Sequence, residues 1–337
     1  MNGLERILAA VRFERPDRIP VIPQVFGHAA RVGDVPLARY VTDGGLMASC
    51  QLAAMEDYGS DAVFALLDAN VETEALGSRL AFPKDGYPFV ERFILDAPEA
   101  VAGLGIPDPQ RAGRMPVALE AARRLRQAAG DRLLVAGCVL GPMTLACQLL
   151  GAERALFAAV DEPAAFERVL DFSVAVALSF GAAQLEAGAH LCVVFDPAAS
   201  PAVAPPAFFR ELLAPRLRRL NEGLRSQGAL ATWLHIAGPV EPILPLYPAC
   251  GVDIANLDYC VDPRRARAAA PRLCLEGNIR SLAFVDSEPR DITEACARVL
   301  DAGAGFILSS GCEIPLDARP DCIRALAAAA RDGACRP

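Results

Sequence analysis

Eight short runs of apolar and β-branched residues recur along this chain, and segments with helical spacing separate them. Alternating strands and helices favour a parallel sheet, because a parallel strand pair needs a long crossover between its members. The runs are mainly apolar, which is typical of strands that are covered on both faces. We expect these strands at Ile19–Pro23, Ala62–Asp68, Leu133–Val139, Leu191–Asp196, Thr232–Ile236, Ile254–Tyr259, Leu273–Gly277 and Phe306–Ser310.

The segments between the runs support this reading. Residues 117–130 and 163–188 show helical apolar spacing, and each ends in glycine, as a helix C-terminus commonly does. Eight strand–helix units predict a closed (β/α)₈ TIM barrel rather than an open doubly wound sheet. The shortest crossover, residues 261–272, is barely long enough for a parallel connection. No Gly-, Ser- or Pro-rich linker divides the chain, so we expect residues 1–337 to form a single domain.

Composition narrows the class of protein. The net charge of −8 argues against a nucleic-acid binder and against docking on an anionic membrane. Residues 133–152 are uncharged over a length that could span a bilayer, but Gly141-Pro142 breaks the stretch and favours strand, turn and helix. The 11 cysteines are scattered and odd in number, which does not suit a disulfide framework. We therefore expect a cytoplasmic enzyme.

Polar residues follow the predicted strands. In a barrel of this type the active site lies at the C-terminal ends of the strands. A lone Asp at such a position can also be a helix cap or turn former, and His28 could simply pack. His190 precedes its strand, so we expect a structural role for it. The residues at the C-terminal strand ends are His28, Asp68, Cys138, Asp196, His235, Asp258, Glu276, Asn278 and Cys312.

His235 and Cys312 suggest metal or thiol chemistry, because imidazole and thiolate are good zinc ligands. Zinc also lowers the pKa of a bound thiol until it is a thiolate at neutral pH. A catalytic zinc commonly takes three protein ligands and keeps one position open. The third ligand could come from several residues between which the sequence does not choose: Glu241, Asp258, Cys260, Asp196 or His28.

At these residues the chain resembles the uroporphyrinogen decarboxylase superfamily along essentially its whole length, and within it the corrinoid-linked methyltransferases of the methylcobamide:coenzyme M type. Their zinc motif is His-x-Cys in one segment and a distant Cys in another. Here LHIAGPVEPIL keeps His235 but has Ala237 in place of the cysteine, and SSGCEIPLDA keeps Cys312. The segments LLDANVETEALG and NLDYCVDPRRARAAAPRLCLEGNIR are also similar to family segments.

The decarboxylases of this superfamily carry an arginine-rich stretch after the first strand that holds the substrate carboxylates. The corresponding segment here, VFGHAARVG, keeps only Arg31. Asp68 aligns with the decarboxylases' key aspartate. The resemblance therefore implies methyl transfer rather than decarboxylation of a tetrapyrrole.

The implied reaction moves a methyl group between a small-molecule donor or thiol acceptor and a cobalamin. The corrinoid would sit on a separate protein, because no Asp-x-His-x-x-Gly motif is found here. Asp68, His235 and Cys312 are the expected catalytic residues, with His235 and Cys312 as zinc ligands; His28, Asp196, Asp258 and Asn278 are expected to bind substrate. Without zinc, His235 could act as a general acid or base.

Two alternatives stay open: a metal-independent lyase or decarboxylase that acts on a small acid or tetrapyrrole, and a non-catalytic binding protein of a corrinoid system.

Overall fold

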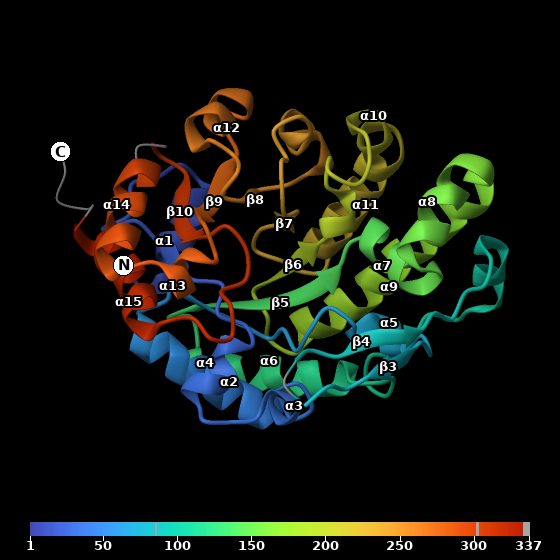
Figure 1. The fold of residues 1–337 in the computed structure, drawn as a ribbon, viewed down its shortest axis with the longest axis horizontal. Helices are drawn as coiled ribbons and strands as arrows, with labels where there is room; N and C mark the ends of the chain where they lie inside the picture. Colours follow the sequence, from blue (N-terminus) through green and yellow to red (C-terminus); the bar gives the residue numbers. More distant parts are fainter. Residues whose placement is uncertain (85, 301–302, 333–337) are drawn as a thin grey trace.

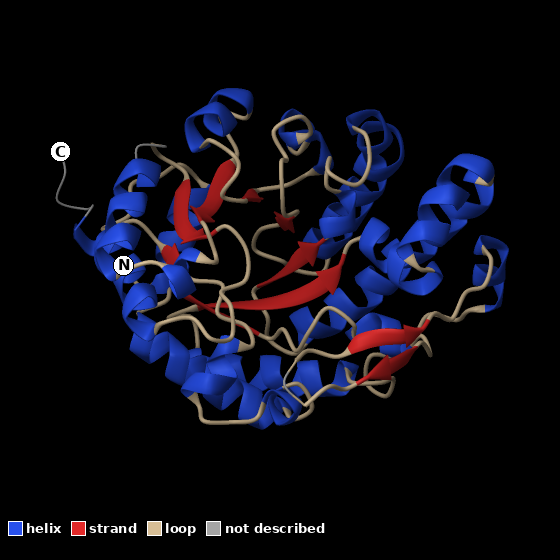
Figure 2. Cartoon of the chain, in the orientation of Figure 1, coloured by secondary structure: helices blue, strands red, loops and turns tan. Residues whose placement is uncertain are grey.

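The computed structural model describes residues 1–84, 86–300 and 303–332. Eight parallel strands form a nearly closed barrel in the order β1-β10-β9-β8-β7-β6-β5-β2, and helices surround it (Figures 1 and 2). The predicted (β/α)₈ TIM barrel is therefore confirmed, and each of the eight expected runs overlaps one strand, with β5 and β9 ending one and two residues beyond their runs. The barrel strands are β1 (Val21–Ile22), β2 (Ala62–Phe64), β5 (Leu134–Leu140), β6 (Leu191–Phe195), β7 (Trp233–His235), β8 (Ile254–Leu257), β9 (Cys274–Ile279) and β10 (Phe306–Ser310).

The seam between the first two strands is held by one residue. The backbone N–H of Asp61 donates to the carbonyl of Val21 at 2.9 Å, and the Val21 N–H donates back to the Asp61 carboxylate at 2.9 Å. Arg6 and Arg18 donate to the same carboxylate from outside the sheet. Asp61, which directly precedes β2, thus links β1 to β2 across the gap between the two ends of the strand order.

The helices carry the crossovers. Helices α6 and α9 cover the two segments with helical spacing, and α12 fills the short crossover between β8 and β9. The α-helices are α1 (Gly3–Val11), α2 (His28–Val32), α3 (Leu37–Tyr40), α4 (Gly44–Tyr58), α5 (Val71–Ala75), α6 (Met115–Ala129), α7 (Pro142–Leu150), α8 (Ala152–Asp161), α9 (Pro163–Glu186), α10 (Pro206–Phe208), α11 (Ala214–Ser226), α12 (Pro263–Ala269), α13 (Ala283–Asp286), α14 (Pro289–Val299) and α15 (Pro320–Asp332). Short 3₁₀ turns lie at Pro98–Gly103, Pro197–Ala199, Leu244–Leu246 and Pro248–Cys250, and a π-helical turn lies at Phe209–Leu213.

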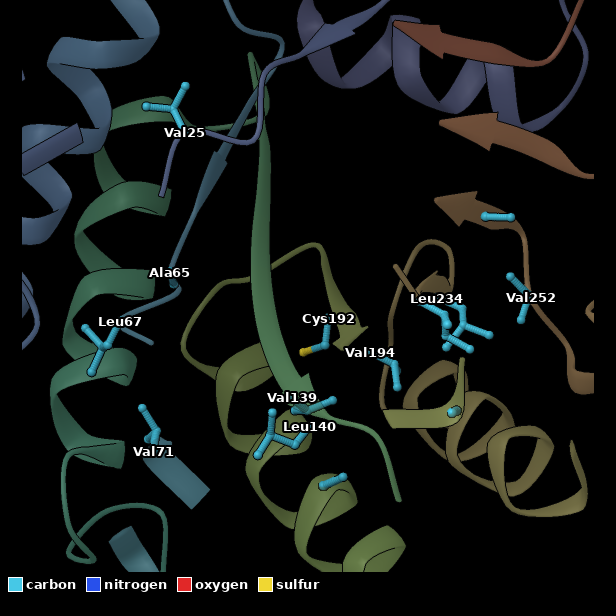
Figure 3. Close-up of a cluster of buried hydrophobic side chains, with 14 of the residues drawn as sticks. Val25, Ala65, Leu67, Val71, Val139, Leu140, Cys192, Val194, Leu234 and Val252 are labelled. Atoms are coloured by element: carbon cyan, nitrogen blue, oxygen red, sulfur yellow. The ribbon is translucent and has the colours of Figure 1, made fainter. Parts of the chain in front are cut away.

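The core has two layers because successive residues of a strand face opposite sides. Along β5, Leu134, Ala136 and Cys138 pack inside the barrel, whereas Val135 and Val139 pack against the covering helices. Figure 3 shows the outer layer, where Val139 and Leu140 lie near Cys192 on the neighbouring strand. This alternation decides which side chains reach the barrel interior.

Residues 133–152 form a strand, the Gly-Pro break and helix α7, as predicted, so this stretch does not form a single span. Among the described helices, α9 is long and apolar enough to cross a membrane by length and composition alone. Half of its most apolar window is buried inside the protein, and one such helix is only weak evidence for a membrane span.

One element was not predicted. An antiparallel hairpin of β3 (Arg79–Ala81) and β4 (Phe89–Arg92) lies outside the ring of barrel strands, at the edge of the molecule (Figure 1). Its strands are short and rich in charged and exposed residues, so they lack the apolar signal of the barrel strands.

Candidate active site

A cavity of about 240 Å³ opens at the C-terminal ends of the strands. It is bounded by the segments that follow β1 and β2, by the ends of β5, β6 and β7, and by the loop after β10. The three residues expected to be catalytic, Asp68, His235 and Cys312, all line it. The barrel therefore brings together side chains that are far apart in the sequence.

His235 is positioned by the alternation of β7. Trp233 packs inside the barrel, Leu234 packs outside it, and the His235 imidazole therefore points inward again. There its ring lies 4.6 Å, centroid to centroid, from Phe195 on β6. Burial lowers the pKa of His235 to about 3. The imidazole is thus neutral at pH 7, which suits a metal ligand and makes it a poor general acid.

Cys312 follows the end of β10, and its Sγ atom lies 3.9 Å from Nε2 of His235. Burial raises the pKa of the Cys312 thiol to about 11. Without a metal, the pair is therefore a neutral thiol beside a neutral imidazole, and not a thiolate–imidazolium pair of the kind that activates nucleophilic cysteines.

The fit to zinc is incomplete. The two donor atoms are close enough to share one ion, but within the described ranges no group of three or more His, Cys, Asp or Glu side chains could hold a metal. Ala237, which stands where the second cysteine was expected, lines the same cavity but offers no donor. The residues present supply two of the three ligands that a catalytic zinc commonly takes.

The residues considered as third ligands have other partners or lie elsewhere. The Asp258 carboxylate accepts hydrogen bonds from the backbone of Gly238 at 2.8 Å and of Tyr259 at 2.7 Å. Glu241 forms an ion pair with Arg265 at 3.0 Å. Cys260 is exposed and borders a different cavity.

His28, Asp196 and Asn278 do not line the cavity. The His28 ring is buried between the Tyr58 hydroxyl at 2.8 Å and the Leu316 carbonyl at 3.0 Å. Asp196 accepts the backbone N–H of Thr144 at 2.7 Å near the start of α7, and burial raises its pKa to about 6. Asn278 donates to the Val261 carbonyl at 2.6 Å. These contacts are structural, and so is the contact of His190 with the backbone of β5 through the Val135 N–H.

Asp68 is held by a cation that the sequence did not indicate. Arg114, which precedes α6, pairs with both oxygens of the Asp68 carboxylate and donates to Glu74 at 2.6 Å. Its guanidinium also lies 5.1 Å from the centre of the Phe82 ring. Asp68 is therefore a paired carboxylate at the cavity wall, fixed in one orientation.

Four further polar residues of the cavity were not predicted: Asn70, Glu72, Tyr87 and Glu313. Tyr87, from the turn between β3 and β4, donates to Glu313 at 2.5 Å. Glu72 accepts the Leu140 N–H at 2.7 Å, and burial raises its pKa to about 7. Glu313 could have been found, because it directly follows Cys312 at a strand end. Tyr87 could not, since the hairpin gave no signal.

Comparison with known proteins agrees with this geometry. The family model described as "Uroporphyrinogen decarboxylase (URO-D)" matches residues 2–333. The methylcobamide:CoM methyltransferase MtaA of Methanosarcina barkeri is 29% identical over 331 residues, which cover 96% of each chain. A uroporphyrinogen decarboxylase of Anaeromyxobacter is 26% identical over 330 residues, 91% of this chain and 92% of its own. A solved methyltransferase structure from Methanosarcina mazei superposes with a TM-score of 0.90 at 28% identity, covering 98% of both chains.

Proposed function

Because the chain belongs to the uroporphyrinogen decarboxylase family, with full-length methyltransferase relatives, we propose that it is a methyltransferase that moves a methyl group between a corrinoid and a small molecule bound in the cavity. The observation that carries the proposal is the meeting of His235 and Cys312, at 3.9 Å, in one cavity with Asp68. The corrinoid belongs to a separate protein in this proposal.

In the thiol-methylating direction, the sulfur of a thiolate attacks the methyl carbon of methyl-Co(III). The new S–C bond forms as the Co–C bond breaks, and the bond's electron pair stays on cobalt as Co(I). The chain binds the small molecule at the strand ends and keeps water away with the apolar walls of the cavity. The relatives named as methylcobamide:CoM methyltransferases support this direction.

Zinc, when bound by His235 and Cys312, would supply the charge that turns a thiol into a thiolate. Since these residues do not complete a ligand set, the small molecule enters already ionised at sulfur, its proton left in the solvent, and the methyl transfer itself does not require the ion. Asp68 keeps the cavity wall in place through Arg114. Asp196 does not line the cavity, and its carboxylate accepts the backbone N–H of Thr144.

The decarboxylase alternative is less favoured. A tetrapyrrole with many carboxylates needs several cations, whereas no Arg or Lys belongs to the cavity lining as far as the chain is described. The cavity volume of about 240 Å³ is also below the range of about 300 to 1,000 Å³ that is usual for drug-sized ligands.

The test is an anaerobic assay in which the protein is mixed with methylcobalamin and a thiol. The change in visible absorbance measures the loss of the Co–C bond. We expect turnover by the wild type and at least about a hundredfold loss in His235→Ala and Cys312→Ala. Cys147→Ala, in helix α7 and outside the cavity lining, is the matched control and should keep its activity. Binding of a thiol without turnover would favour the non-catalytic alternative, and turnover of a carboxylic acid without corrinoid would favour the lyase.

A further inference from the structure

The charge of the cavity indicates what kind of small molecule it takes, and this inference rests on the proposed function. Three carboxyl groups line the cavity: those of Asp68, Glu72 and Glu313. Over the described part of the chain, the lining contains no Arg or Lys side chain. A bound anion would have to leave water without gaining a cationic partner, which is unfavourable in a buried site.

Arg114 does not provide the missing cation. Its guanidinium is 7% exposed and is already shared between the carboxylates of Asp68 and Glu74. A third contact runs to the Val41 carbonyl at 3.2 Å. The Asp68–Arg114–Glu74 group therefore carries one net negative charge and offers little of its positive charge to a ligand.

The other basic side chains near this end of the barrel face a different space. Arg31 and Lys84 line a separate cavity that is bounded by Gly27 and Leu316. Arg31 is the residue that the segment after β1 keeps from the arginine-rich stretch of the decarboxylases. In this structure it does not reach the cavity that holds His235 and Cys312.

The Glu313 carboxyl group has one oxygen atom that can accept a hydrogen bond from a bound molecule. Both Tyr87 Oη at 2.5 Å and the Gly27 backbone N–H at 3.3 Å donate to its Oε1 atom. Among the described residues, hydrogen bonds reach this carboxyl group only at Oε1, so Oε2 is open to a hydrogen-bond donor on a bound molecule.

Most of the remaining lining is apolar and partly aromatic, from Phe26, Leu67, Leu140, Phe180 and Phe195, and neutral polar groups come from Asn70, Cys138 and His235. Aromatic faces attract cations as well as apolar groups. None of the described lining residues is an Arg or a Lys that would offset the charge of a sulfonate or a carboxylate.

We propose that the small-molecule substrate carries a neutral or cationic group beside its reacting sulfur, and that the site rejects compounds of the same size with an anionic group in that place. The protein would thus differ from methyltransferases whose acceptor is coenzyme M, a thiol that carries a sulfonate. Glu313 sets this preference by its negative field and its open Oε2 atom.

Binding separates this inference from the proposed function. Three thioethers of similar length differ in charge only at one end: 2-(methylthio)ethylamine, 2-(methylthio)ethanol and 2-(methylthio)ethanesulfonate. In isothermal titration calorimetry with the full chain, we expect the amine or the alcohol to bind at least about tenfold more tightly than the sulfonate, a difference of about 1.4 kcal/mol. Equal or tighter binding of the sulfonate, or no binding of any of the three, would overturn the inference.

Two variants sharpen the measurement. Glu313→Gln should bring the affinities for the amine and the sulfonate closer together by about threefold or more, because it removes a charge and keeps the shape. Glu211→Gln, an exposed carboxylate, should leave the ratio unchanged. An unchanged ratio in Glu313→Gln would also count against the inference. If the protein shows charge selectivity but no methyl transfer, only the proposed function is refuted. If it methylates the thiol that corresponds to the sulfonate thioether at full rate, only the inference is refuted.

Discussion

The Sγ atom of Cys312 lies 3.9 Å from Nε2 of His235, although 77 residues separate the two in the chain. The contact spans the barrel end from β7 to the loop after β10, and Ala237 lines the same cavity. Two side chains that can bind zinc therefore lie side by side, and Ala237 adds a methyl group and no donor to the same cavity.

We predict that Ala237→Cys restores a zinc site. With a third donor, the variant should hold about one zinc per chain after dialysis, whereas the wild type should hold clearly less, because two ligands bind zinc weakly. Elemental mass spectrometry of anaerobically purified protein measures this. Ala237→Ser, which adds no thiolate, is the control. A wild type that retains one zinc per chain as firmly as the variant would show that another ligand completes the site.

The reactivity of Cys312 should depend steeply on pH. Because burial raises its pKa to about 11, the thiolate fraction grows about tenfold for each pH unit between pH 7 and 9. The rate of alkylation by iodoacetamide, followed by peptide mass spectrometry of metal-free protein, should grow in the same proportion. A rate that is independent of pH over this range would instead indicate a thiolate paired with a charged imidazole.

Removal of Arg114 should destabilise the protein strongly. Arg114→Met leaves the Asp68 carboxylate, whose side chain is 1% exposed, without its cation, and we expect a loss of about 3 to 5 kcal/mol in the free energy of unfolding. Urea denaturation gives this value. Arg124→Met, which breaks an exposed ion pair with Glu120, should cost no more than about 1 kcal/mol. Adding Asp68→Asn to Arg114→Met should recover part of the loss, and equal costs for the two Arg variants would contradict the prediction.

Glu276 should make stability depend on pH. Burial raises its pKa from 4.5 to about 7, although Gln24 at 3.1 Å and Asn256 at 2.9 Å donate to the carboxyl group. The folded protein thus keeps a proton that the unfolded chain releases. The stability contribution is complete below pH 4.5 and is lost as the pH rises to about 7, by about 3 kcal/mol.

Glu276→Gln removes this titration. Between pH 4.5 and 7.5, the free energy of unfolding of the wild type should therefore fall by about 3 kcal/mol more than that of the variant. Denaturant titrations across the range test this, with the exposed Glu222→Gln as the control. Parallel profiles of the wild type and Glu276→Gln would show that Glu276 does not titrate in this window.

The barrel could be predicted because its signal is local. Continuous apolar runs mark the strands, and the alternation along β7 makes Trp233 and His235 share the interior face. The shared position of His235 and Cys312 followed from one fold rule, that strand ends converge. The hairpin of β3 and β4 could not be predicted in this way, because its short strands are not buried.

Side-chain direction beyond a strand end was the harder part. His28 turns toward Tyr58, and Asp196 turns to the start of α7, since each finds a hydrogen-bond partner there that the sequence does not reveal. The pairing of Asp68 with Arg114 joins residues 46 apart through tertiary structure alone. The low pKa of His235 likewise depends on burial, which makes the imidazole a poor general acid.

The hairpin of β3 and β4 stands outside the barrel yet contributes Tyr87 to the cavity and Phe82 to Arg114. The strands that carry His235 and lead to Cys312 are built independently of it. A relative could therefore acquire a different substrate preference by exchanging this hairpin while its barrel stays unchanged. For protein engineering, the hairpin is the natural segment to graft or randomise.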